Sequence, residues 1–482
     1  MATVGYATPQ GRWVLAAAVM GSGVAFLDGT VVNVALPAIG DDLGTSITGL
    51  QWTVDAYLVT LSALLLLGGS LGDRFGRRAM FVYGLAAFTA ASVLCGVAPS
   101  SGFLVAARGL QGVGGALLVP GSLAIIAATF DNEDRGRAVG AWAGLAGLAS
   151  SVGPFLGGWL IDAVSWRLIF LINVPLAAVA AAIAIRHVPE SRAPDEVPLD
   201  VTGALLVTAS LAAIAFAAID HSGTGAAVAG AGGALGLLAF VAVERTSPHP
   251  MLPLKMFRSA QFTGANLTTL AVYAGLSGGL FLVVLRLQVS LQYSALEAGA
   301  ALTPFTVLML VLSPRAGQVG QRVGARIPMT VGPIVAGVGL ALLSRAGPGD
   351  HYVSTVLPGV VVFGTGMAIT VAPLTSAVLA SATDALAGVA SGVNNAVARL
   401  AGLLAVAALP ALAGISTEGS IGSSLGDGYG TALSISAGLC VAGGVIAAAT
   451  VRETAPTRAV AHPSPYHACQ HQAVADEGRP AA

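Results

Sequence analysis

About fourteen apolar stretches follow one another along the chain, and they constrain its fold more than any other feature. Because a helix rises about 1.5 Å per residue, about 20 apolar residues cross the hydrocarbon core of a bilayer. Only 9% of the residues are charged, whereas soluble domains have roughly 25%, so the apolar surface needs lipid. The sequence therefore predicts an all-α integral membrane protein. Its spans are expected near residues 13–38, 50–68, 79–98, 103–128, 137–160, 167–187, 200–220, 225–243, 262–285, 297–314, 327–345, 353–378, 386–413 and 430–451.

A glycine-rich, arginine-rich segment between two of these stretches occurs twice. Residues 69–78 read GSLGDRFGRR, and residues 317–326 read GQVGQRVGAR, with three glycines and two arginines at the same positions. Such an internal repeat indicates two related helical bundles. We predict two pseudo-symmetric six-helix bundles, at residues 1–190 and 251–452, and two inserted helices within residues 191–250. Residues 453–482 are expected to be a disordered cytoplasmic tail.

Arginine placement predicts the orientation of the chain. With the N-terminus inside, nearly all loop cations fall on the cytoplasmic side, and the external loops hold little beyond Arg167, Arg286 and Arg345. By the positive-inside rule both termini are cytoplasmic. Lysine occurs once, at Lys255, which is a weak compositional sign of a bacterial, GC-rich source. We therefore expect a multi-pass protein of the cell membrane.

Two carboxylates and one arginine are expected well inside the bilayer, at similar depth. They are Asp28, Asp55 and Arg108. Because a charged acid in lipid is costly unless it is paired, such an acid tends to bind a proton or a cation. Competition between a proton and a substrate for one site produces antiport. The structural alternatives are a capping role for Asp28, a solvated position for Asp55, and an Arg108 bonded to carbonyl groups.

The Gly69–Arg78 segment has a second interpretation besides topology. Asp73 lies among three arginines and adds nothing to a positive-inside signal, so it is expected to pair across the bundle interface and hold one conformation. The alternative is a tight turn that glycine permits. The predicted gating residues are Gly69, Asp73, Arg74, Gly76, Arg77 and Arg78. In the fifth span, Gly153–Pro154 should kink the helix and help it close against a partner helix.

The second half of the chain shows no carboxylate at mid-depth, which weakens the case for dicationic substrates. Its buried polar residues are Asn266, Asn394, Asn395 and Arg399. Arg399 is either a second coupling cation or a partner of helix carbonyls. No Walker motif occurs, so ATP is not expected to drive the protein directly. No metal-ligand spacing or catalytic constellation occurs either, so we predict no enzyme, cofactor or metal. A net charge of −1 argues against nucleic acid as a partner.

Several motifs resemble those of the fourteen-span drug:proton antiporters of the major facilitator superfamily. They are residues 27–37 (LDGTVVNVALP), 52–57 (WTVDAY), 69–78, 108–112 (RGLQG), 153–158 (GPFLGG) and 166–175 (WRLIFLINVP). The resemblance implies the major facilitator fold and export of drugs or antibiotics in exchange for protons, by a monomer whose partners are lipid, protons and a small molecule. The implied proton-coupling or substrate residues are Asp28, Asn33, Asp55, Arg108, Gln111, Asn394 and Arg399, and the antiporter motif is Gly153, Pro154, Gly157 and Gly158. The alternatives are an exporter of one endogenous metabolite or self-made antibiotic, and a membrane sensor that does not transport.

Overall fold

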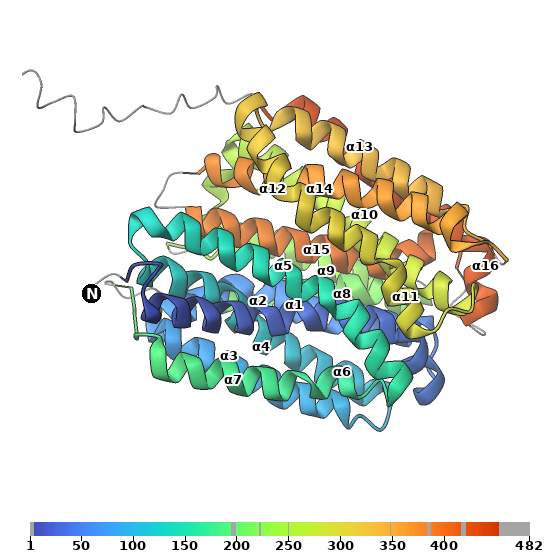
Figure 1. Cartoon of the computed structure of the whole chain (residues 1–482), viewed down its shortest axis with the longest axis horizontal. Helices are drawn as coiled ribbons and strands as arrows, with labels where there is room; N and C mark the ends of the chain where they lie inside the picture. The colour runs from blue at the N-terminus through green and yellow to red at the C-terminus, as the bar shows by residue number, and fades with distance from the viewer. Residues whose placement is uncertain are drawn as a thin grey trace, which may run out of the picture.

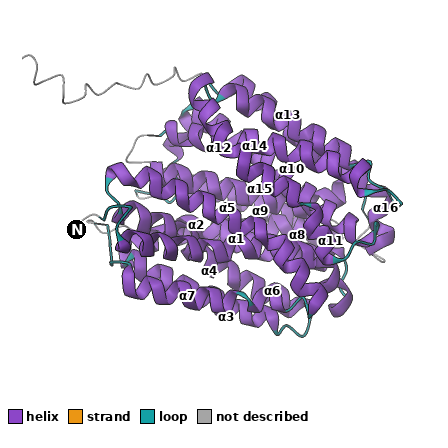
Figure 2. Ribbon diagram, in the orientation of Figure 1, coloured by secondary structure: helices purple, strands orange, loops and turns teal. Residues whose placement is uncertain are grey.

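The structure of the protein is a computed structural model that describes residues 4–193, 199–220, 223–248, 250–347, 349–382, 387–415 and 421–452. These residues form helices and their connections, with one isolated β-bridge between Val4 and Phe130 (Figure 2). The tail expected at residues 453–482 lies outside the described part of the chain.

Thirteen of the fourteen predicted spans correspond to helices that are long and apolar enough to cross a membrane, among the residues described. The remaining prediction coincides with α5, which runs alongside α1. The helices are α1 (Pro9–Leu43), α2 (Ile47–Phe75), α3 (Arg77–Gly96), α4 (Ser101–Thr129), α5 (Asn132–Ala163), α6 (Leu168–Leu171), α7 (Asn173–His187), α8 (Val201–Ile219), α9 (Gly223–Thr246), η1 (Leu254–Arg258), α10 (Ala260–Val289), α11 (Ala295–Ala301), α12 (Thr303–Val323), α13 (Arg326–Leu343), η2 (Tyr352–Val356), α14 (Leu357–Ala380), α15 (Ala387–Leu412) and α16 (Ile421–Thr450).

The helices group into a first bundle, α1 to α7, and a second bundle, α10 to α16. In Figure 1 the blue and green helices of the first bundle lie below the yellow and orange helices of the second. Between the two bundles, α2 packs along α15, and α5 contacts α11 and α12. The inserted helices α8 and α9 pack against each other, and α8 also packs on α2 and α15. The exact boundaries at residues 190, 250 and 452 stay predictions.

Small residues bring the helix backbones together in both bundles. A Cβ atom at Gly114 of α4 would lie 2.5 Å from the backbone nitrogen of Phe88 in α3. In the second bundle, a Cβ atom at Gly366 of α14 would collide with the backbone of Ala336 in α13. Within a bilayer the hydrophobic effect does not drive helices together, because lipid tails are as apolar as the side chains. Close packing of small residues is therefore a main source of helix association.

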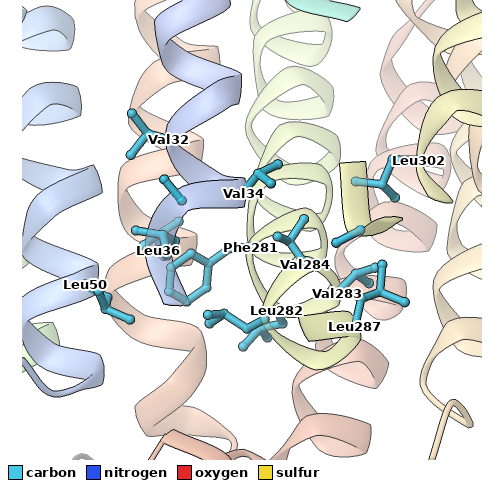
Figure 3. Close-up of a cluster of buried hydrophobic side chains, with 14 of the residues drawn as sticks. Val32, Val34, Leu36, Leu50, Phe281, Leu282, Val283, Val284, Leu287 and Leu302 are labelled. Atoms are coloured by element: carbon cyan, nitrogen blue, oxygen red, sulfur yellow. The ribbon is translucent and has the colours of Figure 1, made fainter. Parts of the chain in front are cut away.

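The two bundles are sealed together at one end of the molecule. We call this end, where α1 stops at Leu43, the Gly44 end, and the opposite end, where α2 meets α3, the Gly76 end. At the Gly44 end one cluster of buried apolar side chains includes Leu36 and Leu50 of the first bundle and Phe281 and Val284 of the second. Figure 3 shows Leu36 next to Phe281. Water is therefore excluded from the bundle interface at this end.

Candidate functional site

A fully buried ion pair joins α1 to α4 inside the first bundle. Nη1 of Arg108 lies 2.6 Å from Oδ2 of Asp28, and both side chains are at most 2% exposed. Burying two charges is costly, and the attraction between them offsets that cost only when further hydrogen bonds satisfy the remaining polar atoms. Burial of the Asp28–Arg108 pair therefore carries a desolvation cost, which is typical of a functional site.

Two neutral amides complete the hydrogen bonding of Asp28, and a hydroxyl group holds both amides. Gln111 of α4 and Asn173 of α7 donate to Oδ1 of Asp28 at 2.8 and 3.0 Å. Both amides also donate to the Ser92 hydroxyl of α3. Arg108 donates in turn to the Gln111 side-chain oxygen at 2.6 Å. The network thus connects α1, α3, α4 and α7 through one carboxylate.

Aromatic rings and a backbone carbonyl hold the guanidinium in place. The guanidinium carbon of Arg108 lies 4.4 Å from the ring centre of Tyr57 and 5.8 Å from that of Phe170. Its Nε donates to the carbonyl oxygen of Thr53 at 3.1 Å. Cation–π contacts of this kind stabilise a desolvated guanidinium by up to about 2 kcal/mol. The sequence analysis included Gln111 in this site but not Ser92, Tyr57 or Asn173. A polar Asn173 inside an apolar span was the available signal.

Asp55 lies apart from this network, although it was expected at the same depth. The guanidinium of Arg108 lies against the ring of Tyr57 on α2, and residues two apart on a helix point in nearly opposite directions, so Asp55 points away from Arg108. Asp55 shares its stripe of α2 with Gln51, which donates to carbonyl oxygens of α15, and with Val59, which packs against Leu211 of α8. The side chain is fully buried, and neither carboxylate oxygen has a hydrogen-bond partner among the described residues. Asp55 is therefore a buried acid without a cation, at the seam of α2, α8 and α15.

A cavity of about 640 Å³ lies between the two bundles. Residues of α1, α5, α10, α12 and α14 line it, and the lining residues that the structure describes carry no charge. Most are apolar, and Asn33, Tyr273 and Ser313 are among the polar ones. Asn33 is separated from Asp28 by about 140° around α1, because successive residues turn by about 100°. The α1 helix therefore has the ion pair on one side and the cavity on the other.

The two candidates of the second bundle lie in different places. Asn394 of α15 donates to Asn266 and Thr269 of α10, at 3.2 and 2.7 Å, so its amide links two helices of one bundle. Arg399 of α15 lies instead over the ring of Phe26 in α1, with its guanidinium carbon 5.3 Å from the ring centre. It therefore contacts the opposite bundle.

The Gly69–Arg78 segment folds onto the chain that follows α7. Asp73 forms an ion pair with Arg77 at 2.8 Å, which corrects the expectation that it pairs across the bundle interface in this conformation. The i,i+4 spacing at the end of α2 puts this partner closer than any helix of the other bundle. The Glu190 carboxylate accepts hydrogen bonds from the backbone nitrogens of Arg78 and Ala79, both at 3.1 Å. Of the remaining motif residues, Arg74 lies in the last turn of α2 and Gly76 caps its end, whereas Gly69 lies more than a turn earlier on the same helix.

Gly76 is the residue that permits this turn. Its φ is +115°, and a Cβ atom would lie 2.8 Å from the Glu190 carboxylate. We expect Gly76→Ala to lower stability by about 1–3 kcal/mol, through backbone strain and the loss of the Glu190 contacts. The midpoint of thermal aggregation, followed by size-exclusion chromatography in detergent, should fall. Gly69→Ala is the control, because its Cβ would meet only Pro120 at 3.7 Å. Equal midpoints for the two variants would refute this role of Gly76.

Glycines of α5 form the close crossing between the bundles at the Gly44 end. A Cβ atom at Gly158 would lie 2.5 Å from the carbonyl oxygen of Ala295 in α11, and one at Gly299 would collide with the carbonyl of Pro154. One turn beyond, the Asp162 carboxylate accepts from the backbone nitrogens of Ala295 and Leu296, at 3.1 and 2.8 Å. The other motif glycines, Gly153 and Gly157, face Thr30 and Val31 of α1.

Two helical bundles around an uncharged cavity, with a buried ion pair beside it, define a membrane transporter that works from a site between its halves. The family model described as Major Facilitator Superfamily matches residues 18–406, and the chain belongs to this superfamily. As a superfamily transporter it is not an enzyme.

The chain is similar to several curated transport and resistance proteins. It is 36% identical to a protein named probable actinorhodin transporter, from Streptomyces coelicolor, over 83% of this chain and 72% of that protein. It is 33% identical to the multidrug resistance protein Stp of Mycobacterium tuberculosis, over 77% of this chain and 70% of that protein. Among solved structures, a POT family transporter with a bound thioalcohol-conjugated peptide shares the fold. Its TM-score is 0.69 at 14% identity, covering 92% of this chain and 96% of that one.

Proposed function

We propose that this transporter exports drugs or antibiotics, as amphipathic small molecules, across the cell membrane in exchange for protons. The observation that carries the proposal is the fully buried Asp28–Arg108 pair on the face of α1 opposite the central cavity. A carboxylate held this way changes its interactions with α4 and α7 when it takes up a proton. The names of the curated relatives support drugs and antibiotics as the cargo.

Alternating access would use residues 1–190 and 251–452 as two rigid bodies, with residues 191–250 packed at their edge. Arginines gather at the Gly76 end, among them Arg74, Arg137 and Arg326. By the positive-inside rule, this distribution supports a cytoplasmic position for both termini. In that orientation the seal at the Gly44 end closes the outer side, and the cavity faces the cytoplasm. All the groups involved belong to one chain, which supports action as a monomer.

Helix α1 would couple the protonation of Asp28 to the cavity and to the closed outer end of the molecule. Asp28 lies on one side of it, and Asn33 lines the cavity on the other. One residue further, the carbonyl oxygen of Val34 accepts a hydrogen bond from Gln288 of the second bundle at 2.9 Å. Protonation of Asp28 would weaken its bond to Arg108 and let α1 shift, which would bias both the binding site and the closed outer end.

Asp55 would be a second proton-binding group. Asp55 is buried at the contact between the two bundles and has no cation beside it among the described residues. Burial disfavours a charged carboxylate, so Asp55 would ionise only when this contact opens to water. We expect Asp55→Asn to preserve folding and to bind drug normally but to lower the number of protons exchanged per drug molecule. Charge movement per molecule, measured in proteoliposomes on a solid support, is the test. An unchanged ratio would remove Asp55 from the proton path.

A narrower version of the function is an exporter of one antibiotic. The curated relative named for actinorhodin favours it, because that name refers to a single compound. A substrate panel separates the two versions by the number of compounds accepted.

Everted membrane vesicles test the proposal as a whole. A respiratory substrate acidifies the vesicle interior, a fluorescent amine reports the pH gradient, and a panel of cationic, neutral and acidic drugs is then added. We expect some drugs to collapse the gradient in vesicles that contain the protein and not in vesicles without it. No response to any drug, with the protein folded and inserted, would refute proton-coupled drug export and favour a sensor.

A further inference from the structure

Arg399 places a positive charge at the contact between the two bundles, beside the cavity. The ring below its guanidinium is that of Phe26. Phe26, Thr30 and Asn33 follow one another at the i, i+4 and i+7 positions of α1, so they share one face of that helix. Thr30 and Asn33 line the cavity. The guanidinium of Arg399 therefore lies over the stripe of α1 that borders the cavity.

No acid neutralises this charge in the described part of the chain. The four ion pairs found there involve other arginines, and Arg399 has no hydrogen bond to any described residue. Asp28 is already satisfied by Arg108, Gln111 and Asn173. Asp55 faces α15 as well, but neither of its carboxylate oxygens has a hydrogen-bond or ion-pair partner among the described residues. A guanidinium carries five N–H donors, and none of those of Arg399 is used by a residue that the structure describes.

Aromatic side chains surround the position of Arg399. The rings of Phe26 and Trp142 lie 6.4 Å apart, centre to centre. Tyr273 of α10, the helix that packs along α15, lines the cavity. The described lining of the cavity has no carboxylate, so it offers no anionic group that would favour a cation. A weakly hydrated environment of this kind strengthens a pairing between a guanidinium and an anion.

We propose that Arg399 binds the acidic group, a carboxylate or a phenolate, of an aromatic substrate whose ring system lies in the cavity. This inference rests on the proposed export function and names its substrate class. The planar guanidinium would donate two parallel hydrogen bonds to the acidic group while it stacks on Phe26. Export of such a molecule would remove one negative charge with each cycle.

Equilibrium dialysis with the full chain in lipid nanodiscs tests the inference. The probes are anthraquinone-2-carboxylate and its neutral analogue anthraquinone-2-carboxamide, and empty nanodiscs correct for partition into lipid. We expect wild type to bind the carboxylate at least about tenfold more tightly, which is the scale of one charge-assisted, two-pronged contact. Arg399→Gln should reduce this preference to about one, and Arg399→Lys should keep part of it. Arg315→Gln, at an exposed cation of α12, should keep all of it.

The outcomes separate this inference from the proposed function. Equal binding of the two probes to wild type, no binding of either, or a preference that survives in folded Arg399→Gln would each overturn the inference. If that happens while drugs still collapse the pH gradient in vesicles, the export function stands alone. If the preference depends on Arg399 but no compound moves protons, the anion site stands and the coupling fails.

Discussion

Replacing Asp28 by asparagine is expected to abolish proton-driven drug resistance while the protein stays folded and inserted. Asparagine keeps the size of the side chain and one acceptor oxygen for Arg108, Gln111 or Asn173, but it cannot gain or lose a proton. A host strain without its own efflux pumps should therefore become as sensitive to the exported drug as the strain without the protein. The minimal inhibitory concentration, at matched membrane protein levels, is the measurement.

Asp42→Asn is the matched control for this variant. Asp42 lies on the same helix and pairs with Arg167 at 2.6 Å, but both side chains are partly exposed. A solvent-exposed pair of this kind contributes little to stability, so resistance should stay close to wild type. If both variants lose resistance equally, the loss reflects the general sensitivity of α1, and a special role of Asp28 is refuted.

Gly158→Val is expected to open the Gly44 end of the molecule. The added side chain would press on the backbone of Ala295, where α5 crosses α11, and over-packing of this kind costs about 1–3 kcal/mol. That cost falls only on the closed arrangement, so the equilibrium should shift by about tenfold or more towards an open outer end. The reporter is a cysteine introduced at Leu36, in a background without native cysteines, labelled by a bulky maleimide in detergent.

Gly144→Val on the same helix is the control, because a Cβ at Gly144 meets no atom within 4 Å. The labelling rate of this variant should equal that of the Leu36→Cys protein that keeps both glycines. An unchanged rate in Gly158→Val would mean that the α5–α11 crossing does not hold the outer end closed.

The architecture could be predicted from the sequence, because the length of each apolar stretch and the repeat of one motif can be recognised without knowing any tertiary contact. Thirteen predicted spans coincide with membrane-length helices of the described chain, and the repeated glycine–arginine segment spans the C-terminal ends of α2 and α12. The pairing of Asp28 with Arg108 was also within reach, since a buried acid needs a cation and the two were expected at one depth.

The sequence did not predict the partners of several polar side chains, because these partners depend on how each helix is rotated about its axis. Asp55 has the same depth as Asp28, but its side of α2 faces α8 and α15, so Arg108 is out of its reach. Asn173 enters the network only because α7 packs beside α1. Asp73 found a partner four residues away instead of one across the interface. Each of these outcomes depends on which face a helix presents, and one sequence does not determine that.

The most direct test of the central claim compares two modes of transport in the same proteoliposomes, for wild type and Asp28→Asn. The radiolabelled substrate is the drug that gives the largest response in vesicles. We expect Asp28→Asn to exchange internal for external drug at a rate near that of wild type, but to accumulate none when a pH gradient is imposed. Gradient-driven accumulation in Asp28→Asn, at any level, would contradict the account, because transport would then be coupled without a proton at Asp28, through Asp55 or another group.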